Sequence, residues 1–166
     1  MTKSIGFYSF RYGLYYVLVI AAIFAAIYAL KTFAPDLAAS LQGGGSSGVG
    51  AVSIILPPMM VAQAFYRHES RAMTRGEGWS MAVIFTILAF VLTAGMMYAG
   101  TLIQPLSTYE LSELQYLLNE ERNMLLIVVA VGAVFLLLTN RLMLWAGVRG
   151  ELKKAEKIAA RKASKG

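Results

Sequence analysis

Cysteine is absent from this chain of 166 residues, and histidine occurs once, as His68. The lack of thiols excludes disulfides, thiolate metal sites and cysteine nucleophiles. A single histidine leaves no serine with a convincing general base, and the sequence contains no G-x-S-x-G turn. A lone histidine without nearby carboxylate clusters is also a poor metal site. We therefore expect a protein that is not an enzyme and that holds no cofactor and no metal ion.

Carboxylates are missing from four long apolar runs, at residues 12–30, 48–66, 79–99 and 124–145. Each run has about 20 residues, and a helix of that length spans the hydrocarbon core of a bilayer, which is about 30 Å thick. The sequence therefore predicts an all-α integral membrane bundle of four transmembrane helices, forming a single domain over residues 1–166. Coupled transporters and pumps usually need carboxylates within the membrane, so their absence argues against that class.

Basic residues are unevenly distributed among the segments between these runs. They gather before residue 12, in the loop 67–78 and in the tail 146–166, whereas the connections 31–47 and 103–123 carry only Lys31 and Arg122. Because Lys and Arg accumulate on the cytoplasmic side, both termini are predicted to be cytoplasmic in a bacterial inner membrane. We expect the tail to be a basic helix near anionic headgroups, with no nucleic-acid partner.

Aromatic residues stand near the ends of the apolar runs, where we expect an interfacial belt. The members of this set are Tyr12, Tyr15, Tyr16, Tyr66, Trp79, Tyr98 and Trp145. Arg141 precedes Trp145 by about one turn, and we expect its side chain to snorkel toward the cytoplasmic surface.

Small and polar residues mark expected contacts between helices. Small-xxx-small spacing lets helix backbones approach closely in lipid, and amide side chains can bridge helices. The residues expected to pack helices or to contact a partner are Gly44, Gly48, Gly50, Gln63 and Asn140. Pro57-Pro58 lies in the middle of the second run, where a structural kink is favoured over a break that builds a substrate site.

The segment 103–123 has the features of a short amphipathic helix on the external membrane surface. Ser107 and Glu110 have capping-box spacing, and Leu111, Leu114 and Leu118 share one helical face. We expect this helix to rest on the membrane. The alternative is that its acidic face, with Glu110, Glu113 and Glu120, is a docking surface for a partner.

The order Gln63-Ala64-Phe65 followed by Arg71-Ala72-Met73-Thr74-Arg75-Gly76-Glu77-Gly78-Trp79 resembles a family of small, uncharacterised bacterial four-helix inner-membrane proteins. The shared pattern is R-x-x-T-x-x-E-x-W, and Met73 stands where that family commonly has proline. The resemblance covers roughly residues 10–100, and it implies the fold and topology but no activity.

The same motif has a local physical interpretation. Thr74 and Glu77 form a capping box that starts the third helix, and Trp79 anchors that helix at the interface. Arg71 is expected to pair with Glu77 or to bind a lipid phosphate.

These features favour a non-enzymatic membrane protein that acts by association with other membrane subunits or with itself. It would be an accessory or assembly subunit of a larger complex, or a homo-oligomer. One alternative is a small channel or uncoupled transporter built around Pro57-Pro58 and the glycine-rich start of the second helix. A further alternative is an immunity protein that protects the membrane from a toxin.

Overall fold

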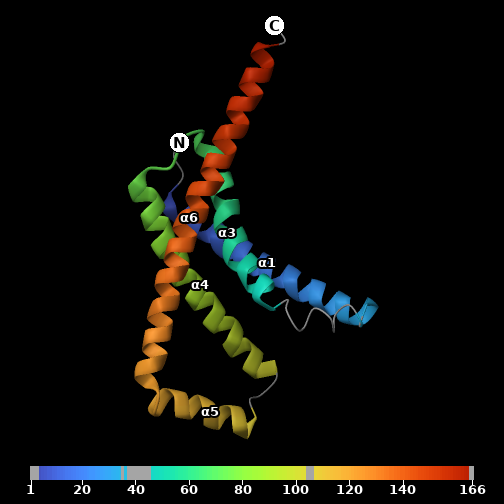
Figure 1. Cartoon of the computed structure of the whole chain (residues 1–166), viewed down its shortest axis with the longest axis vertical. Helices are drawn as coiled ribbons and strands as arrows, with labels where there is room; N and C mark the ends of the chain where they lie inside the picture. The colour runs from blue at the N-terminus through green and yellow to red at the C-terminus, as the bar shows by residue number, and fades with distance from the viewer. Residues whose placement is uncertain (1–3, 35, 37–45, 104–106, 165–166) are drawn as a thin grey trace.

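The computed structural model describes residues 4–34, 36, 46–103 and 107–164. Within these ranges the regular structure is entirely helical (Figure 1). The helices are α1 (Ile5–Phe33), α3 (Ser46–Glu69), α4 (Arg75–Ile103), α5 (Thr108–Asn119) and α6 (Arg122–Ala163). The expected all-α class is therefore confirmed for the part of the chain that is described.

Three of the described helices are long and apolar enough to cross a membrane, namely α1, α4 as far as Leu102, and α6. They contain the runs predicted at 12–30, 79–99 and 124–145. The run at 48–66 lies in α3, which does not reach the same apolar length among the described residues. These helices indicate a helical membrane protein.

The fourth apolar run continues without interruption into the basic tail. α6 has 42 residues, which at about 1.5 Å per residue gives a helix of about 63 Å, roughly twice the thickness of the hydrocarbon core. Its C-terminal part projects beyond the other helices (Figure 1). The prediction that the tail is helical to about Ala163 is confirmed.

Helix α3 runs without a break through Pro57 and Pro58, both of which are fully buried. Each proline lacks a backbone N–H donor, which weakens the helix locally. A substrate site within the membrane would require the helix to break at these prolines. Because the helix is continuous on both sides of the prolines, the described structure has no such break.

The packing is concentrated at one end of the molecule, which we call the packed end. α1 and α6 each contact both α3 and α4 there, and the N-terminus lies near the connection between α3 and α4 (Figure 1). The buried core is composed of Tyr8, Tyr12, Tyr16, Val61, Ala62, Phe65, Met81, Ala82, Phe85, Ala89, Leu144 and Val148. All four long helices therefore contribute to a single core.

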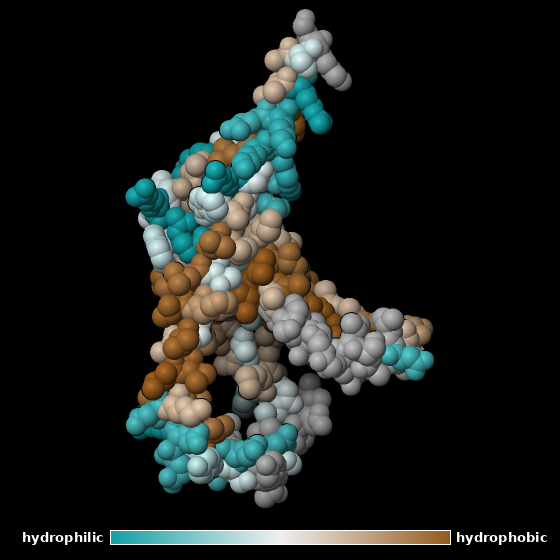
Figure 2. Space-filling view, in the orientation of Figure 1, coloured by the Kyte–Doolittle hydropathy of each residue, from teal (hydrophilic) through white to brown (hydrophobic). Residues whose placement is uncertain are grey.

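Beyond this core the helices separate, and we call residues 17–33 of α1, 90–103 of α4 and 122–139 of α6 the diverging halves (Figure 1). No residue of these segments whose exposure is described is buried. Phe24 is 68% exposed, Met97 70% and Phe135 65%. In Figure 2 hydrophilic residues gather at α5 and toward the C-terminal part of α6, with apolar surface between them. This apolar zone has the character of a lipid-facing surface.

Candidate functional site

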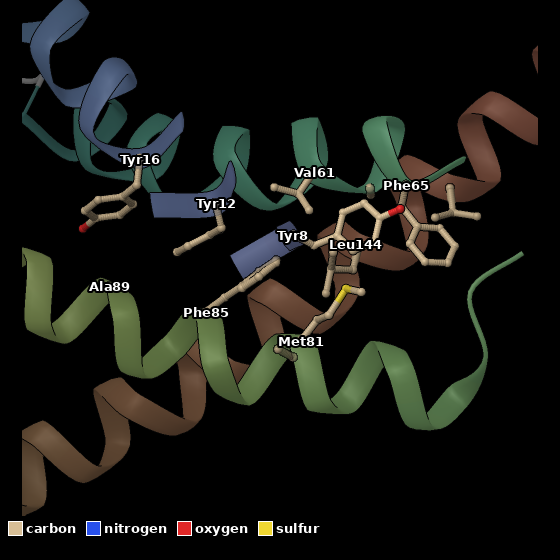
Figure 3. Close-up of a cluster of buried hydrophobic side chains, with 12 residues drawn as sticks. Tyr8, Tyr12, Tyr16, Val61, Phe65, Met81, Phe85, Ala89 and Leu144 are labelled. Carbon is tan, nitrogen blue, oxygen red and sulfur yellow. The ribbon is translucent and has the colours of Figure 1, made fainter. Parts of the chain in front are cut away.

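Three tyrosines of α1 form the centre of the packed end. Tyr8, Tyr12 and Tyr16 follow one another at intervals of four residues, so they share one face of the helix, and all three are buried. Tyr12 stacks on Phe85 of α4, with ring centroids 4.1 Å apart and planes inclined by 11° (Figure 3). The expectation that Tyr12 and Tyr16 belong to an interfacial belt is therefore wrong. The tyrosine face of α1 packs against α3 and α4 and is part of the buried core.

Asn140 brings a polar group into this apolar core. It is 0% exposed, and its side-chain Nδ2 donates a hydrogen bond of 3.2 Å to Oγ1 of Thr86 on α4. The Thr86 hydroxyl in turn donates to the carbonyl of Ala82 at 2.8 Å. Asn140 thus bridges α4 and α6, as amide side chains can do in membrane helices.

The Tyr12 hydroxyl and Oδ1 of Asn140 are buried, and neither makes a hydrogen bond of good geometry to a described residue. The two side chains interact with each other, so they are polar neighbours within the core. The nearby Tyr16 hydroxyl is hydrogen-bonded to Oγ1 of Thr93 at 2.9 Å. Gln63, the other polar residue expected to bridge helices, is half-buried and makes no side-chain hydrogen bond to a described residue.

An ion-pair network lies in the connection between α3 and α4. Arg71 donates from Nη1 and Nη2 to the two carboxylate oxygens of Glu77, at 3.0 and 2.7 Å. The backbone N–H and the hydroxyl of Thr74 donate to Glu77 at 2.8 and 2.9 Å, and the Glu77 N–H donates to Oγ1 of Thr74 at 3.3 Å. The predicted capping box and the predicted pairing of Arg71 with Glu77 are both present. The hydrogen bonds between Arg71 and Glu77 raise the pKa of Arg71.

This network reaches the tyrosine face through Glu69, a residue that sequence reasoning did not select. The Glu69 side chain is only 5% exposed, and its Oε2 lies 3.7 Å from Nε of Arg71. Its Oε1 accepts a hydrogen bond of 3.4 Å from the Tyr8 hydroxyl. The one sign of the contact between Tyr8 and Glu69 in the sequence is the tyrosine repeat in α1. That repeat does not identify Glu69 as the partner or α3 as the helix that provides it.

Arg141 lies against the start of α4. Its guanidinium carbon is 5.7 Å from the centre of the Trp79 ring, and a Cβ added to Gly78 would be only 2.9 Å from the same carbon. The Nε atom is buried without a partner. No carboxylate of the described residues pairs with this guanidinium. Trp79 is 46% exposed, which agrees with its expected place at an interface.

Helices α3 and α6 lie close together at Gly147, which sequence reasoning also did not select. A Cβ at this position would lie 2.6 Å from Cβ of Ala62 and 3.0 Å from the carbonyl oxygen of Met59. Gly147 lies beyond the end of the predicted span at 124–145. Small-residue spacing within that span therefore could not identify Gly147 as a helix contact. Of the glycines that were predicted to pack helices, Gly44 lies outside the described residues. Gly48 and Gly50 lie in the first part of α3, where only the backbone is described.

Helix α5 begins with the predicted capping box. The Ser107 backbone N–H and hydroxyl both donate to Glu110 at 2.8 Å, and the Glu110 N–H donates to the Ser107 hydroxyl at 3.3 Å. The bonds from Ser107 lower the pKa of Glu110. This carboxylate therefore stabilises its own helix. Glu113 and Glu120 are exposed, while Leu111 and Leu118 are 45% and 49% exposed.

No protein-family model matches this chain, and no curated protein or solved structure is significantly similar to it. The arrangement of the residues is therefore the basis for a functional proposal. Among the described residues, no three histidine or carboxylate side chains come together as metal ligands would.

Proposed function

We propose that this chain is a non-enzymatic, polytopic protein of the bacterial inner membrane that acts by association. It serves as an accessory or assembly subunit of a membrane complex, or it forms a homo-oligomer. In this proposal α3 is the fourth spanning helix, and both termini lie in the cytoplasm.

The observation that carries the proposal is the unequal packing of the two ends. The tyrosine core fixes the helices to one another at the packed end, while the diverging halves leave large apolar and aromatic side chains uncovered. Tyr28 is 74% exposed, Tyr98 68% and Leu102 68%. Helices in lipid associate through close side-chain packing, so three separated apolar surfaces held by one rigid core are suited to receive helices of other subunits.

The charge distribution supports the proposed orientation. Phe7 near the N-terminus lies 5.8 Å from the ring of His68 at the end of α3, so the N-terminus and the connection between α3 and α4 lie at the same end. Arg11 is close to the N-terminus, Arg71 lies in this connection, and Arg67 and Arg75 lie in the helices directly beside it. Basic segments on the same side of a membrane are typical of the cytoplasmic face.

A tagged chain extracted gently from native membranes and measured by native mass spectrometry tests the proposal. We expect a co-purifying membrane subunit, or a second copy of the chain, in a fixed stoichiometry. Recovery of monomers bound only to lipid would contradict it and would favour the channel or uncoupled transporter, which predicts a solute flux in proteoliposomes.

Two phenylalanines of α1 provide a matched test of where a partner binds. Phe24, in a diverging half, is 68% exposed, and Phe10, at the packed end, is 74% exposed. They lie on nearly the same face of the helix because 14 positions separate them, close to four full turns. A photoreactive phenylalanine at position 24 should crosslink to protein, and one at position 10 should crosslink to lipid. Equal protein crosslinking at the two positions would contradict the role of the diverging half.

A further inference from the structure

Arg141 differs from Arg71 and Arg149, which also lie at the packed end, because its side chain is half-buried and no carboxylate of the described residues pairs with it. Arg71 is neutralised by Glu77 through two hydrogen bonds. Arg149 stacks on Trp145 of its own helix, with 4.8 Å between the guanidinium carbon and the ring centre. Arg141 instead lies between two helices, beside Trp79 and Gly78 of α4. A cation in a partly apolar site needs an anion to offset the loss of its hydration.

We propose that Arg141 binds a phosphate group, that of an anionic phospholipid in the leaflet next to the packed end, between the start of α4 and the C-terminal half of α6. The planar guanidinium carries N–H donors in a fork that matches two phosphate oxygens. Basic pockets between transmembrane helices bind lipid headgroups in this manner. This site goes beyond the proposed function, because a chain acting alone or in a complex could use it.

Three features of α4 favour an anion at this place. The guanidinium lies near the N-terminal turn of the helix, where the helix dipole favours negative charge. Gly78 has no side chain, which lets the guanidinium approach the helix to a distance that a Cβ would prevent. The half-exposed Trp79 stacks near the guanidinium and has the amphipathic character of residues at headgroup level. Glu77, in the same turn, is held by Arg71 and Thr74, so its charge is engaged elsewhere.

Lipid binding to the full chain tests this site. Delipidated protein is exchanged into nanodiscs of phosphatidylcholine with or without phosphatidylglycerol, and retained lipid is measured by native mass spectrometry after release. We expect the wild-type chain to retain phosphatidylglycerol preferentially and Arg141→Gln to lose about tenfold of that preference, a typical effect of removing a charge-assisted contact. The matched control is Arg149→Gln, which removes an arginine that also stacks on tryptophan but within one helix.

A second variant keeps the test valid if Arg141→Gln does not fold. Gly78→Ala retains every charge, and its new methyl group displaces only the flexible end of the Arg141 side chain. It should weaken retention of phosphatidylglycerol while the melting temperature stays near that of the wild type. Equal retention by the wild type and both variants would overturn the proposal. An equal loss in Arg149→Gln would also overturn it, since the effect would then be general attraction to a basic surface.

Free phosphate offers the same chemistry, and Trp79 fluorescence distinguishes the two sources. In a Trp145→Phe background Trp79 is the one remaining tryptophan, because the chain has two. A shift of its emission with phosphatidylglycerol, absent with inorganic phosphate in phosphatidylcholine nanodiscs, supports the lipid site. The same shift with inorganic phosphate alone would overturn the assignment to lipid.

Discussion

Gly147 of α6 lies so close to Ala62 of α3 that a methyl group at Gly147 would come within 2.6 Å of the Ala62 Cβ. The carbonyl oxygen of Met59 lies 3.0 Å from the same point. This contact follows directly after the two buried prolines of α3. The absence of a side chain at Gly147 therefore determines how closely the two helices pack.

We expect Gly147→Ala to lower the free energy of unfolding by about 1–3 kcal/mol, because overpacking a tight contact forces the backbones apart. Gly150→Ala is the matched control, since it lies in the same helix and a Cβ there would meet nothing within 4 Å. The control should be neutral or should stabilise the helix by up to about 1 kcal/mol, the usual helix preference of alanine over glycine. Reversible unfolding in mixed micelles, followed by circular dichroism, measures both values.

A second substitution identifies the cause of that loss. In the Gly147→Ala background, Ala62→Gly removes the methyl group that the new Cβ would strike, so part of the lost stability should return. If Gly147→Ala and Gly150→Ala unfold alike, the helices do not meet as closely as described.

Thr86→Val should destabilise the packed end by about 1 kcal/mol, since it leaves the buried amide of Asn140 without its acceptor. Thr101→Val is the control, because Thr101 is partly exposed and its hydroxyl donates only to the carbonyl of Tyr98 in its own helix. The same micelle unfolding assay measures the difference between the two variants.

The double variant Thr86→Val, Asn140→Leu replaces both partners by apolar groups, and most of the lost stability should return. Additive losses in this double-mutant cycle would show that the bond between Asn140 and Thr86 contributes no coupling energy.

The features that could be predicted from the sequence are local ones. The capping boxes of Thr74 with Glu77 and of Ser107 with Glu110 join residues three positions apart, so their spacing was sufficient to identify them. The helical tail was also predictable from a local property, because no proline interrupts residues 122–163. Apolar length identified the three helices that are able to span a membrane.

The features that were missed depend on which helices become neighbours. Aromatic residues near the ends of a span suit an interface or a core equally well, and contacts with Phe85 and Thr93 of α4 place Tyr12 and Tyr16 in the core. Gly147 becomes important because α3 presents a backbone carbonyl to it. Glu69 is buried because Tyr8 and Arg71 meet it from other segments. Single-sequence periodicity contains no information on such pairings.

Thr74→Ala should increase amide hydrogen exchange over residues 70–78, because it removes the hydroxyl that accepts from the Glu77 N–H and donates to the Glu77 carboxylate. Loss of an N-cap costs about 1 kcal/mol, which corresponds to roughly fivefold faster exchange through local opening. Thr32→Ala is the control, since the Thr32 hydroxyl donates only to the Tyr28 carbonyl within α1. Unchanged protection of this connection in Thr74→Ala would contradict a stabilising role for the cap.

Helix α5 should depend on pH through Glu110. The hydrogen bonds from Ser107 favour the charged carboxylate and lower its pKa in the folded chain. A lowered pKa means that the contribution to stability is complete above the ordinary pKa of a glutamate and is lost as the pH falls through the lowered value. The start of α5 should therefore become less protected from hydrogen exchange in acid.

The titration of Glu110 can be followed directly by the carboxyl carbon chemical shift of selectively labelled, full-length protein in micelles. In Ser107→Ala the hydroxyl bond is removed, so the pKa of Glu110 should move up toward its ordinary value, and the acid-induced loss of protection should begin at higher pH. The backbone N–H of residue 107 still donates to the carboxylate, so the shift should be partial. A Glu110 titration that is identical in the two proteins would show that the Ser107 hydroxyl does not stabilise the carboxylate, and the capping box would then be ruled out as the source of the pH dependence.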